Sequence, residues 1–178
     1  MKIKNYHETI EVPEGITVSL EKGMLTVKGK KGELKRNLFS PKIKMALEGN
    51  NISFSVHQLS KKEKTILGST ISHIKNMFTG VTQGFVYKLK ICSGHFPMTV
   101  SVKNRELSVK NFIGEKIPRL LTLNPDVKVT VEGEVITVEA NDVEIAGQTA
   151  GLIEKVGSRT GYDKRVFQQG IFITQKPS

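Results

Sequence analysis

The sequence of 178 residues has one cysteine, no tryptophan and no long apolar run. A single cysteine, Cys92, excludes an intramolecular disulfide and a cysteine-rich zinc site. No apolar run approaches the roughly 18–20 residues that cross a bilayer, and the first residues lack the apolar core of a signal peptide. These absences predict a cytosolic protein that does not enter a membrane.

Residues that could carry out catalysis are present but not in supporting patterns. No Ser/His/Asp or Cys/His set is found, and the C-x-x-H spacing of Cys92 and His95 lacks a second pair of zinc ligands. The Lys28–Gly32 sequence could cradle a phosphate, but a nucleotide-binding loop opens directly into a helix, and strands are expected on both sides here. We therefore expect no enzyme activity, no cofactor and no metal. An enzyme that uses this turn to bind phosphate is the least favoured alternative.

The sequence contains an internal repeat. Shifted by 82 residues, ITVSLEKGMLTVKGKKGELKRNL (16–38) lies over MTVSVKNRELSVKNFIGEKIPRL (98–120) with nine identical positions in 23. The last three identities place Gly32-Glu33 on Gly114-Glu115 and Leu38 on Leu120. So many matches indicate a tandem duplication.

Each copy has the same order of secondary-structure signals. Alternating apolar residues predict half-buried antiparallel strands, and one amphipathic helix follows them. The first helix is expected after the capping-box sequence Ser60–Glu63 and before Gly80, and the second after Asn141–Glu144 and before Gly157. These signals predict an α+β fold of two tandem homologous domains, each an antiparallel sheet packed on one helix. The apolar side of the first helix is expected to contain Ile66, Leu67, Thr70, Ile71, Ile74 and Met77.

The repeat also predicts the domain boundaries. We expect an N-terminal α+β repeat at residues 1–83 and a C-terminal α+β repeat at 84–178. Residues 158–178 have no counterpart in the first copy, so they are expected to form a basic C-terminal tail with no helix and no packing role of its own. An addition to a repeat is a good place to look for function.

The net charge of +10 favours polyanionic partners, chiefly nucleic acid or an anionic membrane surface, and nucleic acid is the favoured of the two. The surplus lies in two regions, residues 22–44 and the tail, where residues 155–178 carry five basic groups and one acidic group. Aromatic residues make up only 6%, so contacts to the phosphates of folded RNA are expected to dominate over base stacking. The tail residues expected to bind RNA are Lys155, Arg159, Lys164, Arg165 and Lys176. A secondary basic face is expected from Lys28, Lys30, Lys31, Lys35 and Arg36.

Several stretches resemble a known family. The sequences SHIKNMFTGVTQGFVYKLKI (72–91), GHFPMTV (94–100) and VKNFIGEKIPR (109–119) resemble ribosomal large-subunit protein six, called protein nine in eukaryotic cytosolic ribosomes. NDVEIAGQTAGLIE (141–154) and VFQQGIFITQKP (166–177) extend the resemblance over nearly the whole chain. The residues in these stretches are similar to those of archaeal members of the family. Gly94 differs from the family's usual serine, and Lys164 from the aliphatic residue of many members.

The resemblance implies two tandem α+β domains and a role in the large ribosomal subunit. It implies binding to large-subunit rRNA near the sarcin–ricin loop and the base of the factor-binding stalk, with the principal contacts in the second domain. It adds Lys116 and the loop of His95, Phe96 and Pro97 to the expected RNA-binding residues. It also supports Lys176 and the stretch of Lys164, Arg165, Val166 and Phe167.

The favoured hypothesis is therefore a structural, non-catalytic constituent of the large ribosomal subunit in the cytoplasm. Its expected partners are large-subunit rRNA and neighbouring large-subunit ribosomal proteins, with elongation factors nearby, and no homo-oligomer is expected. The alternative is a free nucleic-acid-binding module that acts outside the ribosome.

Overall fold

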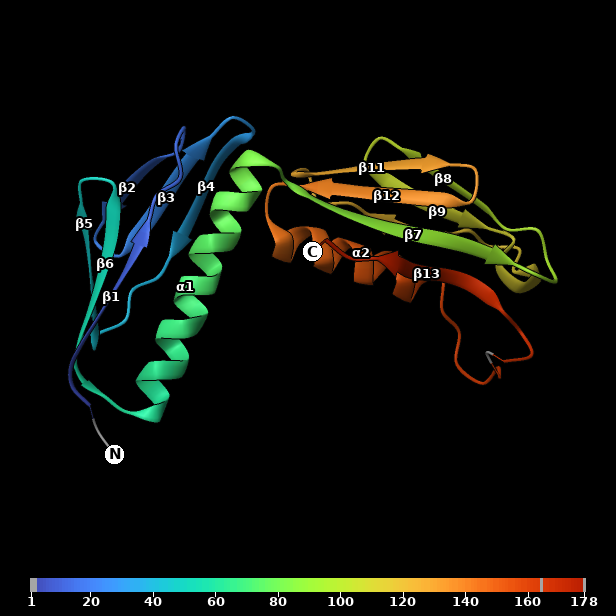
Figure 1. The fold of residues 1–178 in the computed structure, drawn as a ribbon. Coiled ribbons are helices and arrows are strands. Elements are labelled where there is room, and N and C mark those ends of the chain that lie inside the picture. Colours follow the sequence, from blue (N-terminus) through green and yellow to red (C-terminus); the bar gives the residue numbers. More distant parts are fainter. Residues whose placement is uncertain (1–2, 164, 178) are drawn as a thin grey trace. The chain divides into compact units, whose positions relative to one another are not determined.

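A computed structural model describes residues 3–163 and 165–177, and the chain divides into two compact units between Gly84 and Phe85 (Figure 1). All strand pairs in the described ranges are antiparallel. The first unit contains β1 (Ile3–Glu11), β2 (Thr17–Glu21), β3 (Met24–Gly29), β4 (Gly32–Asn37), β5 (Ile43–Glu48), β6 (Asn51–Leu59) and α1 (Lys61–Thr82). The second contains β7 (Phe85–Ser93), β8 (Thr99–Lys103), β9 (Glu106–Lys110), η1 (Phe112–Gly114), β10 (Arg119–Thr122), β11 (Val127–Glu132), β12 (Val135–Ala140), α2 (Val143–Val156) and β13 (Gln169–Gln175).

The first unit has two three-stranded sheets, in the orders β1-β6-β5 and β2-β3-β4, and α1 packs against them (Figure 1). The predicted start of α1 is confirmed, because Ser60 is its N-cap and the Glu63 carboxylate accepts a hydrogen bond from the Ser60 N–H at 3.1 Å. The predicted end at Gly80 is wrong. The helix continues to Thr82, and the N–H groups of Gln83 and Gly84 both donate to the Thr79 carbonyl. Gly84, with φ of +73°, is therefore the glycine that ends the helix.

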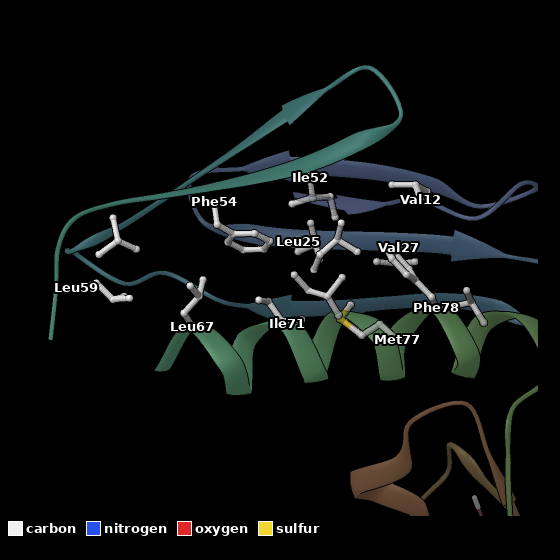
Figure 2. Close-up of a cluster of buried hydrophobic side chains, with 14 residues drawn as sticks. Val12, Leu25, Val27, Ile52, Phe54, Leu59, Leu67, Ile71, Met77 and Phe78 are labelled. Atoms are coloured by element: carbon white, nitrogen blue, oxygen red, sulfur yellow. The ribbon is translucent and has the colours of Figure 1, made fainter. Parts of the chain in front are cut away.

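The core of the first unit lies between the strands and α1 (Figure 2). Leu25 and Val27 of β3 are fully buried opposite α1, while Thr26 and Lys28, which alternate with them along the strand, face outward. Ile66 was expected on the apolar side of the helix but is 45% exposed. The buried stripe follows the i, i+3, i+4 spacing from Glu63 instead, and it consists of Glu63, Leu67, Thr70, Ile71, Ile74, Met77, Phe78, Gly80 and Val81.

The second unit repeats this plan with one more strand, in the sheets β11-β12-β7-β13 and β10-β9-β8. The second helix, α2, packs on β7, β12 and β13 and ends before Gly157, as predicted. Its N-cap is Asp142 rather than the expected Asn141, because the Asp142 carboxylate accepts from the Glu144 N–H at 2.8 Å.

The C-terminal segment is not only a basic tail. Its second half forms β13, which pairs with β7 and places Ile171 in the core at 1% exposed. The expectation that these residues have no packing role is therefore wrong. They add a strand to the free edge of β7 in the second unit, while β1, the matching strand of the first unit, is an edge strand.

The two copies differ most after their third strand. In the first unit β3 and β4 are joined by a two-residue turn, since Gly29 pairs with Gly32. In the second unit residues 111–118, including η1, separate β9 from β10, and Val109 pairs with Arg119. Val27, the counterpart of Val109, pairs with Leu34. The last three identities of the sequence repeat are therefore not structurally equivalent, because the second copy contains a longer connection.

Candidate nucleic-acid interface

Three connections of the second unit meet at one end of it. They are residues 94–98 after β7, residues 111–118 before β10, and residues 155–163 and 165–168 between the end of α2 and β13. Together they are called the loop end below. The Asn111 Nδ2 donates to the Pro97 carbonyl at 2.9 Å, and the Gln169 Nε2 donates to the Phe96 carbonyl at 2.9 Å. Gln169 is buried, so these bonds hold the connections in fixed positions.

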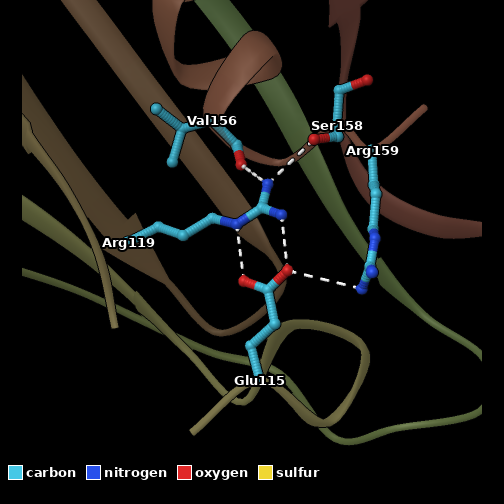
Figure 3. A network of polar contacts seen from close by, with 5 residues as sticks. All are labelled: Glu115, Arg119, Val156, Ser158 and Arg159. Carbon is cyan, nitrogen blue, oxygen red and sulfur yellow. Dashed lines mark hydrogen bonds and ion pairs between the residues drawn. The ribbon is translucent and has the colours of Figure 1, made fainter. Parts of the chain in front are cut away.

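Arg119 is the central link of the loop end (Figure 3). Its guanidinium donates to both oxygens of Glu115, at 2.8 and 2.7 Å, and its Nη1 donates to the carbonyls of Val156 and Ser158 at 2.7 and 2.8 Å. The hydrogen bond from Arg119 lowers the pKa of Glu115, and nearby Arg159, 3.6 Å away, acts in the same direction. A planar guanidinium suits this arrangement because it presents several donors in a fixed fork.

Aromatic rings form a second layer of contacts. The Phe167 ring lies between the rings of His95 and Tyr162, with centroids 5.3 and 5.4 Å away. The Arg159 guanidinium carbon lies 5.1 Å from the Tyr162 ring centroid. These contacts connect His95, which follows β7, to the basic segment beyond α2.

A cavity of about 280 Å³ opens in the loop end. Its walls come from the last turns of α2, the segment that follows, β13 and Ile113 of η1. Ile113 has φ of +49° and ψ of +40°, a left-handed conformation that is costly for a β-branched residue. Strained backbone of this kind concentrates at functional sites. The loop end is therefore the candidate site.

Comparison with known proteins now identifies the family. Residues 12–84 and 96–170 match the family model described as Ribosomal protein L6. The chain belongs to the ribosomal protein L6 family. Two matches in tandem agree with the α+β duplication seen in the structure.

Its relatives in this family include several archaeal proteins. A Sulfurisphaera tokodaii protein named large ribosomal subunit protein uL6 is 44% identical over 99% of this chain and 95% of the relative. Proteins of the same name from Saccharolobus solfataricus and Methanosarcina mazei are 41% and 39% identical, over 99% and 98% of this chain and 98% and 99% of the relatives. The archaeal character expected from the sequence agrees with these relatives.

In this L6-family chain the structure brings six of the expected RNA-binding residues to the loop end. His95 and Phe96 lie in the first connection, exposed Lys116 in the second, and Lys155 and Arg159 at the end of α2 and just beyond it. Arg165 lies in the same third connection, where it pairs with Asp163 at 2.9 Å and remains 89% exposed. Lys164 lies outside the described residues.

Lys176 is at the other end of the sheet. Gln169 of β13 pairs with Ser93 and Gln175 pairs with Lys88, so β13 leads away from the 94–98 connection. At about 3.3 Å per residue, six residues of strand separate Lys176 from the loop end by roughly 20 Å. Lys176 therefore lies apart from the other tail residues, and its expected role in RNA binding stays a prediction.

The lysines and arginine of the first unit do not form one basic face. Lys28 and Lys35 lie on the outer face of the β2-β3-β4 sheet, each 3.0 Å from a carboxylate oxygen of Glu33. The hydrogen bond from Lys35, and next the hydrogen bond from Lys28, lower the pKa of Glu33. Arg36 points to the opposite face because strands alternate, and its Nη2 lies 3.4 Å from Nε2 of His73 on α1.

The other two residues expected on the secondary basic face, Lys30 and Lys31, lie in the turn between β3 and β4. Lys31 donates from its side chain to the Gln83 carbonyl and from its backbone N–H to the Val81 carbonyl, so it fastens the turn to the end of α1. Lys30 is exposed. The turn is followed by β4 and not by a helix, which agrees with its interpretation as a charged turn.

Sequence reasoning missed three residues that hold the loop end together. Arg119, Tyr162 and Gln169 were not singled out as part of the site, whereas Phe167 lies in a stretch to which the family resemblance pointed. One signal was available in the segment that only the second copy has. The chain has few aromatic residues, yet three of them, Tyr162, Phe167 and Phe172, fall within 11 consecutive residues of this segment. Arg119 gave no such signal because the contacts that join it to the end of α2 are with backbone carbonyls far away in sequence.

Within residues 3–163 and 165–177, no group of three or more histidine, cysteine or acidic residues is placed to hold a metal ion. Neither helix of the described residues has the length and apolar character needed to cross a membrane.

Proposed function

We propose that this chain is a structural, non-catalytic constituent of the large ribosomal subunit and binds large-subunit rRNA through the loop end. Membership of the ribosomal protein L6 family supports the first part, since its relatives are named for the large subunit. The gathering of Lys116, Lys155, Arg159 and Arg165 at one end of the second unit carries the second part.

The physical basis is phosphate neutralisation from a fixed frame. Lysine and arginine side chains replace the counterions of an RNA backbone, and the released ions make binding favourable and salt-dependent. A fixed arrangement of the cations matters because phosphate contacts set the position of a protein on RNA and do not depend on the nucleotide sequence. Here Arg119 and the buried Gln169 hold the connections that carry the cations.

The resemblance to protein six supports a finer location. In this proposal the loop end contacts rRNA near the sarcin–ricin loop and the base of the factor-binding stalk, beside other large-subunit proteins and near the site of elongation factors. The chain then acts in the cytoplasm, within the ribosome.

Subunit incorporation of charge variants tests the proposal. The triple variant Lys155→Gln, Arg159→Gln, Arg165→Gln is compared with Lys28→Gln, Lys30→Gln, Lys35→Gln, which removes the same charge from the first unit. Each tagged protein is expressed in a cell that also contains the wild type, and its share in purified large subunits is measured. We expect the first variant to be depleted at least ten-fold and the second to be incorporated.

Two results would count against the proposal. Normal incorporation of the loop-end variant would reject the loop end as the rRNA anchor. A wild-type protein found mainly in the ribosome-free fraction would instead favour the alternative, a free nucleic-acid-binding module.

A further inference from the structure

The cavity of the loop end has walls suited to a flat ring. Tyr162 and Phe167 supply aromatic surfaces, and Ile113, Ile171 and Phe172 supply apolar ones. Its volume of about 280 Å³ is close to the lower limit of roughly 300 Å³ for small-molecule sites, so it suits a single small group. The aromatic rings are held in position by each other and by His95.

Charge is distributed unevenly around this cavity. Lys155 and Arg159 are exposed, whereas Glu154 is partly buried and its Oε1 accepts a hydrogen bond from the Ile173 N–H at 3.3 Å. A carboxylate in the wall repels a phosphate that enters the cavity, while the exposed cations attract one that stays outside. The ligand that fits both features has an uncharged ring and an adjacent anionic group.

We propose that this cavity holds the base of one unpaired RNA nucleotide, with its phosphate at Lys155 and Arg159. The inference rests on the proposed function and extends it from phosphate contacts to a single stacked base. Paired bases in an RNA helix do not present their faces, whereas bases in bulges and loops can be turned outward and stacked on aromatic side chains. Base stacking is therefore a larger part of recognition than the low aromatic content suggests.

Gly151 of α2 allows the cavity to be filled without removing any of its contacts. It lines the cavity, and a Cβ atom built on it meets no heavy atom within 4 Å. Leucine is also a better helix former than glycine. Gly68 of α1 is a matched control, since it too is a helix residue with open space around its Cβ but lies in the other unit.

The experiment measures binding of the full chain to the transcribed large-subunit rRNA of the same organism, at fixed salt. Wild type, Gly151→Leu and Gly68→Leu are compared by Kd and by the chemical reactivity of each RNA base. Loss of one stacked base predicts a roughly ten-fold weaker Kd for Gly151→Leu and the exposure of one unpaired base that the wild type protects. Gly68→Leu is expected to match the wild type, and melting curves of the free proteins check that all three fold.

A complementary pair of variants tests the stacking surface. Tyr162→Ala should expose the same base as Gly151→Leu, and Tyr162→Phe should keep it protected because the ring is retained. If both cavity variants bind rRNA with wild-type Kd and base reactivities, the cavity holds no nucleotide although the proposed function stands. A weaker Kd with no base exposed would also overturn the inference. If the wild type itself does not bind the rRNA, the proposed function fails first.

Discussion

Arg119 and Glu115 form a two-pronged ion pair, with Nε–Oε2 and Nη2–Oε1 distances of 2.8 and 2.7 Å. The same guanidinium donates to the carbonyls of Val156 and Ser158 at the end of α2 and lies 4.2 Å from the centroid of the Phe112 ring. One side chain therefore joins the connection before β10 to the segment after α2, across about 40 residues of sequence.

Replacing Arg119 should destabilise the second unit. Arg119→Lys keeps the charge but cannot reproduce the fork, so carbonyls at the helix end lose their donors. We expect the free energy of unfolding to fall by about 1–3 kcal/mol in urea titrations. Arg165→Lys is the control, because its pair with Asp163 is exposed and should leave stability unchanged. Equal stability of the two variants would show that the Arg119 contacts carry no special weight.

Glu63 should make the stability of the first unit depend on acid pH. Hydrogen bonds from Lys42, and next from Ser60, lower the pKa of Glu63 from 4.5 to about 2. Because the pKa is lowered in the folded chain, the ionised carboxylate stabilises the fold fully above about pH 4.5, and this contribution is lost as the pH falls toward 2. The difference in melting temperature between wild type and Glu63→Gln should therefore shrink across this range. Glu14→Gln, at an exposed site, is the control variant.

Replacement of Gly157 and of Gly151 by alanine should change the free energy of unfolding in opposite directions. A Cβ at Gly157 would lie 2.8 Å from the Ile171 backbone nitrogen, so the end of α2 and β13 would have to separate. Gly157→Ala should lower the free energy of unfolding by about 1–3 kcal/mol. Gly151→Ala has open space and should raise it by up to about 1 kcal/mol. Denaturant titration of both variants checks the pair, and a stable Gly157→Ala would mean that β13 is not held this closely to the helix.

The salt dependence of rRNA binding should show which unit supplies the cations that contact phosphates. If Lys155 contacts a phosphate, Lys155→Gln should reduce the slope of log Kd against log salt by about 0.7–0.9 for rRNA binding. Lys28, already paired with Glu33, should leave the slope unchanged when replaced by glutamine. Filter binding at several salt concentrations measures both. A slope that changes only for Lys28→Gln would assign the RNA contacts to the first unit.

Much of the fold could be predicted because its signals are local. Alternation of apolar residues indicated the strands, and the Ser60–Glu63 spacing located the start of α1. The end of α1 was misplaced because Gly80 carries no mark that distinguishes a buried glycine inside a helix from a terminating one. The helix ends just before Gly84, and the N–H groups of Gln83 and Gly84 both donate to the Thr79 carbonyl.

The candidate site was predictable only in part. Cationic residues of the second unit were found from charge and resemblance, but Lys176 was grouped with them because sequence distance does not give direction along a strand. The prediction that the basic residues of the first unit share one face did not hold for a related reason. Arg36 and Lys35 are neighbours in sequence but lie on opposite faces of β4.

The sequence by itself determined the duplication, the α+β class, the basic character and the family resemblance, since these depend on residue types and short spacings. Tertiary structure decided which residues form a site. Pairing of β13 with β7 brings Phe167 and Gln169 beside the 94–98 connection, and Arg119 reaches the carbonyls of the α2 end. Such contacts depend on the three-dimensional path of the chain, because hydrogen bonds to backbone carbonyls leave no pattern in the partner's sequence.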